Sequence, residues 1–172
     1  MPHFFRALRA AMAASLMGSL AFAGIPAASA DPTGTPADVN TLAAALSKGY
    51  GLNNCNPQTV PNGALAYLQC GQSPDSSGPV LGKYFLFSNG TDLAASFKAV
   101  IEGDTLTNCG DTQSPTSWHQ GSATTNAGSV ACGTFQNQAE IIWTTDAKNV
   151  LGLIRASNGD VPTLYQWWRQ NG

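Results

Sequence analysis

The chain has 172 residues, with 8 basic and 10 acidic side chains and a formal net charge of −2. Charged residues make up only 10% of it, and no stretch gathers the lysines and arginines that displace counterions from nucleic acid. This composition argues against nucleic acid and against an anionic lipid surface as partners.

Residues 1–30 are predicted to be a secretory signal peptide. Two arginines form a basic start, and an uncharged run over residues 10–22 follows them. Ala28-Ser29-Ala30 supplies the small residues that a signal peptidase reads, which places the cut before Asp31. The uncharged run is shorter than the roughly 20 apolar residues of a spanning helix. We therefore expect export to the cell envelope or the medium, without stable membrane insertion after cleavage.

Residues 38–172 are predicted to form a single exported domain behind a flexible leader, residues 31–37. After residue 30 the chain carries six lysines and arginines against ten aspartates and glutamates, a net charge of −4 with histidine neutral. Asp38 is expected to cap a first helix, which carries Leu42 and Leu46 at helical spacing and stops near Gly49.

The cysteines all follow the predicted cut, at Cys55, Cys70, Cys109 and Cys132. An even number of cysteines in an exported chain predicts two disulfides. We favour Cys55–Cys70 and Cys109–Cys132, because each pair joins a loop cysteine to a strand-end cysteine that precedes a glycine. The alternative is a four-cysteine zinc site, against which the wide spacing of the cysteines and the oxidising compartment both argue. No other cluster has metal-binding spacing, so we expect no metal.

The remaining pattern predicts an α+β domain. Strands are expected over residues 64–70, 82–87, 129–136, 139–145 and 149–156, and helices after Asp92 and near Val161-Pro162. The first two strands are expected to pair as an antiparallel hairpin, and residues 105–128 to form a long polar segment. The order of elements indicates an antiparallel sheet of about four to five strands, with the helices on one face and the other face open.

Six segments resemble a known family. They are LAYLQCG (65–71), YFLF (84–87), SPTSWH (114–119), ACGT (131–134), IIWTTD (141–146) and LYQWWRQNG (164–172). Together they look like a small exported domain of actinobacteria, mycobacteria above all. That domain occurs alone after a signal peptide, or as the extracytoplasmic end of transmembrane serine/threonine protein kinases. The resemblance implies a sensor-like or envelope-facing role, with an unknown envelope ligand or protein as partner.

No catalytic residue and no cofactor are predicted. The chain lacks the Gly-rich loop, the strand lysine and the HRD and DFG motifs of a kinase. His119, the only histidine after residue 30, could act as a general base, but no partner that would orient it is evident. A loop histidine packed beside Trp118 is the simpler interpretation. Glu140 and Asp146 could form a carboxylate pair, but we expect both at the water-exposed ends of a strand.

The aromatic residues supply the candidate ligand-binding set: Trp118, Trp143 and Trp168, together with His119. Most aromatic side chains are expected in the core, but a tryptophan exposed near Trp118 and His119 would form a groove for a peptide, a glycan or a lipid head. The leading hypothesis is a secreted, non-enzymatic binding or sensor-like domain. The alternatives are an interaction or structural protein of the envelope, with a flat apolar patch, and a small secreted hydrolase that uses His119.

Overall fold

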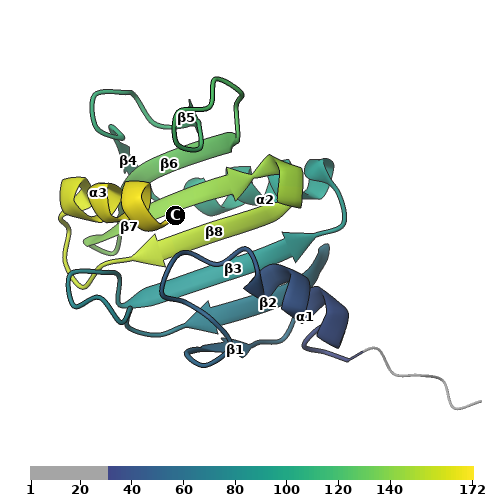
Figure 1. Cartoon of the computed structure of the whole chain (residues 1–172). Coiled ribbons are helices and arrows are strands. Elements are labelled where there is room, and N and C mark those ends of the chain that lie inside the picture. The colour runs from purple at the N-terminus through teal and green to yellow at the C-terminus, as the bar shows by residue number, and fades with distance from the viewer. Residues whose placement is uncertain (1–30) are drawn as a thin grey trace, which may run out of the picture.

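The computed structural model describes residues 31–172 (Figure 1). The predicted signal peptide, residues 1–30, lies outside the described residues. The described part forms an eight-stranded sheet in which each pairing is antiparallel, with three α-helices packed against it. The predicted α+β class is therefore confirmed. Within residues 31–172, no helix is long and apolar enough to cross a membrane.

The helices and strands have the following bounds. The helices are α1 (Pro36–Ala43), α2 (Gly90–Ile101) and α3 (Val161–Asn171), with a 3-10 turn, η1 (Asp146–Lys148). The strands are β1 (Cys55–Pro57), β2 (Ala64–Cys70), β3 (Leu81–Phe87), β4 (Thr105–Thr107), β5 (Thr116–Trp118), β6 (Gly128–Phe135), β7 (Gln138–Thr145) and β8 (Val150–Arg155). Their order across the sheet is β1-β2-β3-β8-β7-β6-β4, and β5 also pairs with β6. The central β3–β8 pairing joins the two halves of the chain.

The helices cover both faces of the sheet, and the prediction that they share one face was wrong. Figure 1 shows α1 and α3 on one face and α2 on the other. Trp143 of β7 packs in the cluster that includes the buried side chains of α1 and α3, whereas its neighbour Ile142 packs with those of α2. Successive strand residues point to opposite faces, so an unbroken buried run such as that in β7 requires cover on both sides.

The sheet has eight strands instead of four or five. The predicted hairpin is confirmed as β2–β3, and the later predicted strands are β6, β7 and β8. The three strands that the prediction missed are β1, β4 and β5, each only three residues long. Such short strands are too brief to show an alternating pattern, and they lie in segments that read as polar loops.

The first helix begins and ends earlier than expected, since it stops at Ala43 and not near Gly49, which leaves Leu46 outside it. Thr35 caps α1 by accepting a hydrogen bond from the backbone N–H of Asp38, so Asp38 is a first-turn residue and not the cap. The preceding backbone lies against the sheet, since a Cβ at Gly34 would come within 2.5 Å of the carbonyl oxygen of Leu65 in β2. Only glycine fits this close approach, and its φ of 90° also favours glycine.

Both predicted disulfides, Cys55–Cys70 and Cys109–Cys132, are confirmed. Cys55 of β1 lies directly opposite Cys70 of β2, and Cys109, just after β4, bonds to Cys132 of β6. All four sulfurs are therefore paired, which leaves no thiolate for the zinc alternative. Each disulfide fastens a short strand at one edge of the sheet to its longer neighbour.

Removing the first disulfide tests this role. The double substitution Cys55→Ala with Cys70→Ala should lower the free energy of unfolding by about 3 kcal/mol, because this disulfide closes a loop with a sequence separation of 15. Urea denaturation of the oxidised wild type and the variant measures the difference. An unchanged midpoint would show that β1 is held by its strand pairing alone.

Candidate functional site

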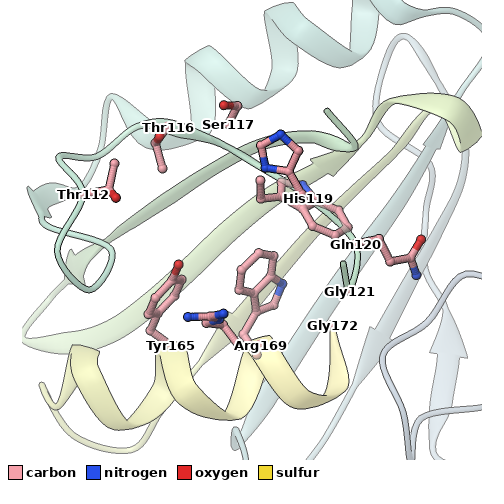
Figure 2. A pocket seen from close by; sticks show the side chains of 11 residues that line it. Thr112, Thr116, Ser117, His119, Gln120, Gly121, Tyr165, Arg169 and Gly172 are labelled. Atoms are coloured by element: carbon pink, nitrogen blue, oxygen red, sulfur yellow. The ribbon is translucent and has the colours of Figure 1, made fainter. Parts of the chain in front are cut away.

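A pocket of about 360 Å³ lies between α3 and residues 112–121, here called the β5 segment (Figure 2). Figure 2 shows Tyr165 and Arg169 rising from α3 toward the segment that carries His119 and Gln120. This cavity is called the α3–β5 pocket below. Its lining consists of Thr112, Thr116, Ser117, Trp118, His119, Gln120, Gly121, Tyr165, Trp168, Arg169 and Gly172.

The sequence of α3 explains how this helix presents its side of the pocket. Asp160 caps the helix by accepting hydrogen bonds from the backbone N–H and the hydroxyl of Thr163. The side chains that α3 buries against the sheet are those of Val161, Leu164, Trp167 and Trp168. Tyr165 and Arg169 are four residues apart, so they share the helix face beside this buried stripe.

Besides the pairing of β5 with β6, three attachments hold the β5 segment in place. The disulfide between Cys109 and Cys132 fixes the chain just before the segment to β6. The Ser114 hydroxyl accepts a hydrogen bond of 2.8 Å from the backbone N–H of Cys132. The indole N–H of Trp118 donates one of 2.8 Å to the carbonyl oxygen of Thr144 in β7. This wall of the pocket is therefore anchored to the sheet.

Trp168 forms the floor of the pocket and contacts three other rings. The ring centroids of Trp118, Tyr165 and Trp143 lie 5.4, 5.6 and 5.7 Å from that of Trp168. Trp118 meets it edge-on and Tyr165 stacks on it, which are the favoured geometries for aromatic pairs. Trp168 itself is only 4% exposed, whereas Trp118 and Tyr165 are half-buried and present ring surface to the cavity.

The indole nitrogen of Trp168 adds an unusual feature to this floor. It is buried and has no hydrogen-bond partner in the described part of the chain. Gly172 covers it, since a Cβ at that position would lie 2.4 Å from the nitrogen. A buried donor without an acceptor is costly and uncommon in folded proteins. The pocket floor therefore contains one polar group that the protein leaves unsatisfied.

The structure brings together three of the four predicted candidate residues. Trp118, His119 and Trp168 all line the pocket, whereas Trp143 is buried behind Trp168 and supports it from the sheet. Sequence reasoning missed Tyr165 and Arg169. The signal that would have found them is their spacing of four residues on a helix whose tryptophans face the core.

The charge of the pocket contrasts with that of the domain. Arg169 is exposed at the rim, and no aspartate or glutamate belongs to the lining. The ion pair formed within residues 31–172 joins Arg155 to Glu140 and leaves Arg169 without a salt-bridge partner. A net negative domain thus presents an unpaired cation at this cavity.

His119 lies at the rim and is exposed. Within residues 31–172, no hydrogen bond joins its ring to a carboxylate or to a serine hydroxyl. The geometry therefore gives His119 none of the orienting contacts that a general base uses.

The carboxylate pair considered from the sequence is arranged differently. Asp146 is exposed as expected, but Glu140 is only 2% exposed and forms an ion pair with Nε of Arg155, its cross-strand partner in β8. The guanidinium of Arg155 also lies 5.1 Å from the ring centroid of Phe135. The expectation that Glu140 lies in water was wrong, because an arginine on the adjacent strand compensates its buried charge.

A third carboxyl group, that of Asp104, lies beside this ion pair. Burial raises its pKa to about 6, and the negative charge of Glu140 adds to the effect, while Arg155 opposes it. The Oδ2 atom of Asp104 is buried without a hydrogen-bond partner. A proton on this oxygen could be donated to Glu140, which explains physically why the neutral form is favoured.

This arrangement predicts a pH-dependent stability. Because the folded-state pKa of Asp104 is raised above 3.8, the folded protein loses stability as the pH rises from about 4 through 6. Asp104→Asn removes the ionisation, so at pH 7 we expect the variant to be more stable by about 1 kcal/mol, a value reduced for the water that still reaches this group. Denaturation midpoints at pH 4 and pH 7 measure the effect.

The exposed neighbour Glu102 provides the control, since Glu102→Gln removes one negative charge from the same turn without touching the ion pair. A stability difference between wild type and Asp104→Asn that does not grow from pH 4 to pH 7 would contradict the assigned cause.

Two substitutions compare how much a residue at the rim of the pocket and a residue in its anchored wall contribute to the free energy of unfolding. His119→Ala should change the free energy of unfolding by less than about 0.5 kcal/mol, because the side chain is exposed. Trp118→Ala should cost about 2 kcal/mol, because it removes both ring packing on Trp168 and the hydrogen bond to Thr144. Thermal unfolding of both variants checks the order, and equal losses would show that the β5 segment is not held by Trp118.

No protein-family model, no curated protein and no solved structure matches this chain. The resemblance to an exported actinobacterial domain therefore remains a prediction that rests on the six sequence segments.

Proposed function

We propose that this chain is an exported, non-enzymatic binding domain of the cell envelope, and that the α3–β5 pocket is its ligand site. The observation that carries the proposal is the pocket itself. It joins an aromatic floor to a rim of hydroxyl, amide and guanidinium groups, drawn from two segments that are far apart in the sequence. A concave site with ring surfaces and a few convergent polar groups is typical of small-molecule binding.

Two further observations support export. The two disulfides are of the kind that form and persist in oxidising compartments. The first thirty residues have the composition of a secretory signal peptide. The resemblance to the extracytoplasmic ends of serine/threonine kinases adds a sensor-like role to the proposal, without any kinase activity.

The two alternative functions have less support. An interaction surface should expose a contiguous apolar patch. Of the large exposed hydrophobic residues, Leu52 precedes β1 and Leu65 lies on β2, whereas Leu106 lies on β4 toward the opposite edge of the sheet. A hydrolase should hold a carboxylate or a serine against His119, and the described residues offer no such contact. A ligand pocket accounts for more of the geometry than either alternative.

Amide chemical-shift mapping tests the proposal. The oxidised chain, labelled with ¹⁵N, is titrated with a diverse panel of water-soluble fragments that includes sugars, amino acids and short peptides. We expect the fragments that bind to shift the amides of residues 112–121 and 165–172. Tyr165→Ala should weaken these fragments about tenfold, because it removes ring surface from the cavity.

Tyr67→Ala is the matched control, since Tyr67 lies on β2 and stacks on Phe85, away from the pocket. It should leave fragment binding unchanged. If no fragment shifts the pocket amides, or if those that bind map to another surface, the pocket is not the ligand site and the proposed function fails.

A further inference from the structure

We infer that the α3–β5 pocket recognises a sugar that carries a carboxylate, an inference that rests on the proposed binding function and specifies its ligand class. Three properties of the lining carry it: one unpaired cation, an aromatic surface, and a set of hydroxyl and amide groups. Each property selects a different part of the ligand.

The cation, Arg169, favours a ligand that carries a negative charge. Arg169 stands at the rim without a salt-bridge partner among residues 31–172, and the lining contains no acidic side chain that would repel an anion. The planar guanidinium offers two parallel N–H groups to one carboxylate, a geometry that lysine lacks. The rest of the domain is net negative, so Arg169 is the side chain of the lining whose fixed positive charge can attract a small anion.

The aromatic surface selects a ring. Tyr165 stacks on Trp168, with an angle of 19° between the ring planes, and Trp118 meets Trp168 at 76°. Two half-buried rings in different planes thus border one cavity, and the C–H face of a sugar ring packs well on such surfaces. Arg169 follows Tyr165 by one helical turn, so a ring placed on Tyr165 brings its acidic substituent close to the guanidinium.

The polar side chains of the lining favour a ligand that carries hydroxyl groups. Thr112 and Thr116 carry hydroxyls and Gln120 carries an amide, all from the β5 segment. These groups both donate and accept hydrogen bonds, as sugar hydroxyls do. The volume of about 360 Å³ lies near the lower end of the roughly 300–1,000 Å³ of small-molecule sites, which suits one or two sugar rings.

The test uses glucose and glucuronate, which share a ring and differ by one carboxylate. Binding to the oxidised chain is followed by tryptophan fluorescence, because two tryptophans line the pocket, and by calorimetry. We expect glucuronate to bind about tenfold more tightly than glucose at low salt, since a charge-assisted hydrogen bond adds to the shared ring contacts. Added sodium chloride should reduce this advantage.

Arg169→Gln should remove the preference, so that the two sugars bind with affinities within about twofold of each other, because the substitution removes the cation and keeps a polar side chain. Lys98→Gln is the charge-matched control. Lys98 is exposed on α2, which covers the opposite face of the sheet, and its removal should leave the preference intact.

The outcomes separate the inference from the proposed function. If fragments or glucose bind in the pocket but glucuronate is not preferred, the acidic-sugar assignment is wrong and the binding function stands. If N-acetyl-alanyl-alanine, which has a carboxylate but no sugar ring, binds as tightly as glucuronate, the pocket recognises a peptide terminus and the inference fails. If no compound reaches the pocket, both fail together.

Discussion

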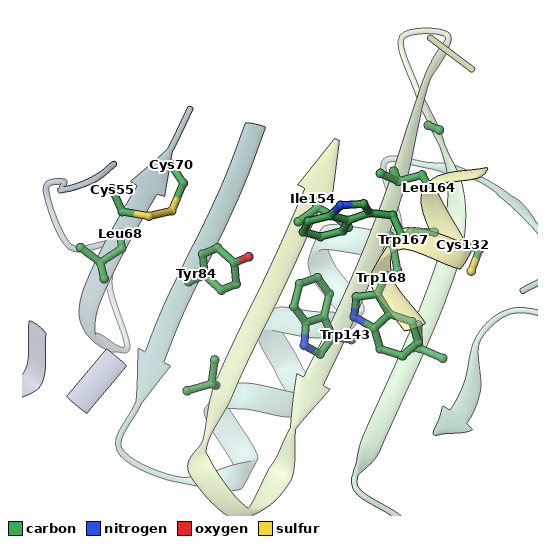
Figure 3. Close-up of a cluster of buried hydrophobic side chains, with 14 of the residues drawn as sticks. Cys55, Leu68, Cys70, Tyr84, Cys132, Trp143, Ile154, Leu164, Trp167 and Trp168 are labelled. Atoms are coloured by element: carbon green, nitrogen blue, oxygen red, sulfur yellow. A yellow bond between two sulfur atoms is a disulfide. The ribbon is translucent and has the colours of Figure 1, made fainter. Parts of the chain in front are cut away.

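A closed circuit of aromatic contacts holds one face of the sheet to the C-terminal helix, and Figure 3 shows its members Tyr84, Trp143, Trp167 and Trp168. From Trp168 it passes to Trp143 of β7, then to Tyr84 of β3 and to Tyr50, and it returns to α3 at Trp167. Each of these ring centroids lies between 5.7 and 6.4 Å from the next. The circuit needs Gly152 in β8, because a Cβ there would lie 2.3 Å from the ring of Trp143. The position of α3, and so of the pocket, depends on this packing.

The aromatic circuit also holds the pocket in place. Its floor, Trp168, is a member of the core, and its outer wall is tied to β6 and β7 by a disulfide and two hydrogen bonds. A site whose walls are already held in place loses little conformational entropy when a ligand enters. The exposed groups at the rim, Arg169 and His119, contribute little to this framework, so ligand selectivity at the rim is separable from stability.

The ion pair between Glu140 and Arg155 lies on the other face of the sheet. Glu140 and Trp143 are three residues apart in β7, so they point to opposite sides. The carboxyl group of Asp104, with its pKa raised to about 6 by burial and by Glu140, couples this second face to pH. A change of pH therefore changes the charge of a carboxyl group on the α2 side of the sheet, whereas ligand binding is proposed on the α3 side.

The sequence by itself determined the elements whose pattern is local. The Cys-Gly strand ends predicted both disulfides, the alternating and apolar runs predicted the longer strands, and the pairing of Trp118 with His119 in one polar segment marked a wall of the pocket. Only the tertiary structure decided that helices cover both faces, that three-residue strands form edges, that Trp143 lies behind the pocket, and that Tyr165 and Arg169 belong to it. The reason is physical: capping and alternation depend on near neighbours, whereas burial of Glu140 or convergence on Trp168 depends on strands and helices that meet only after the chain has folded.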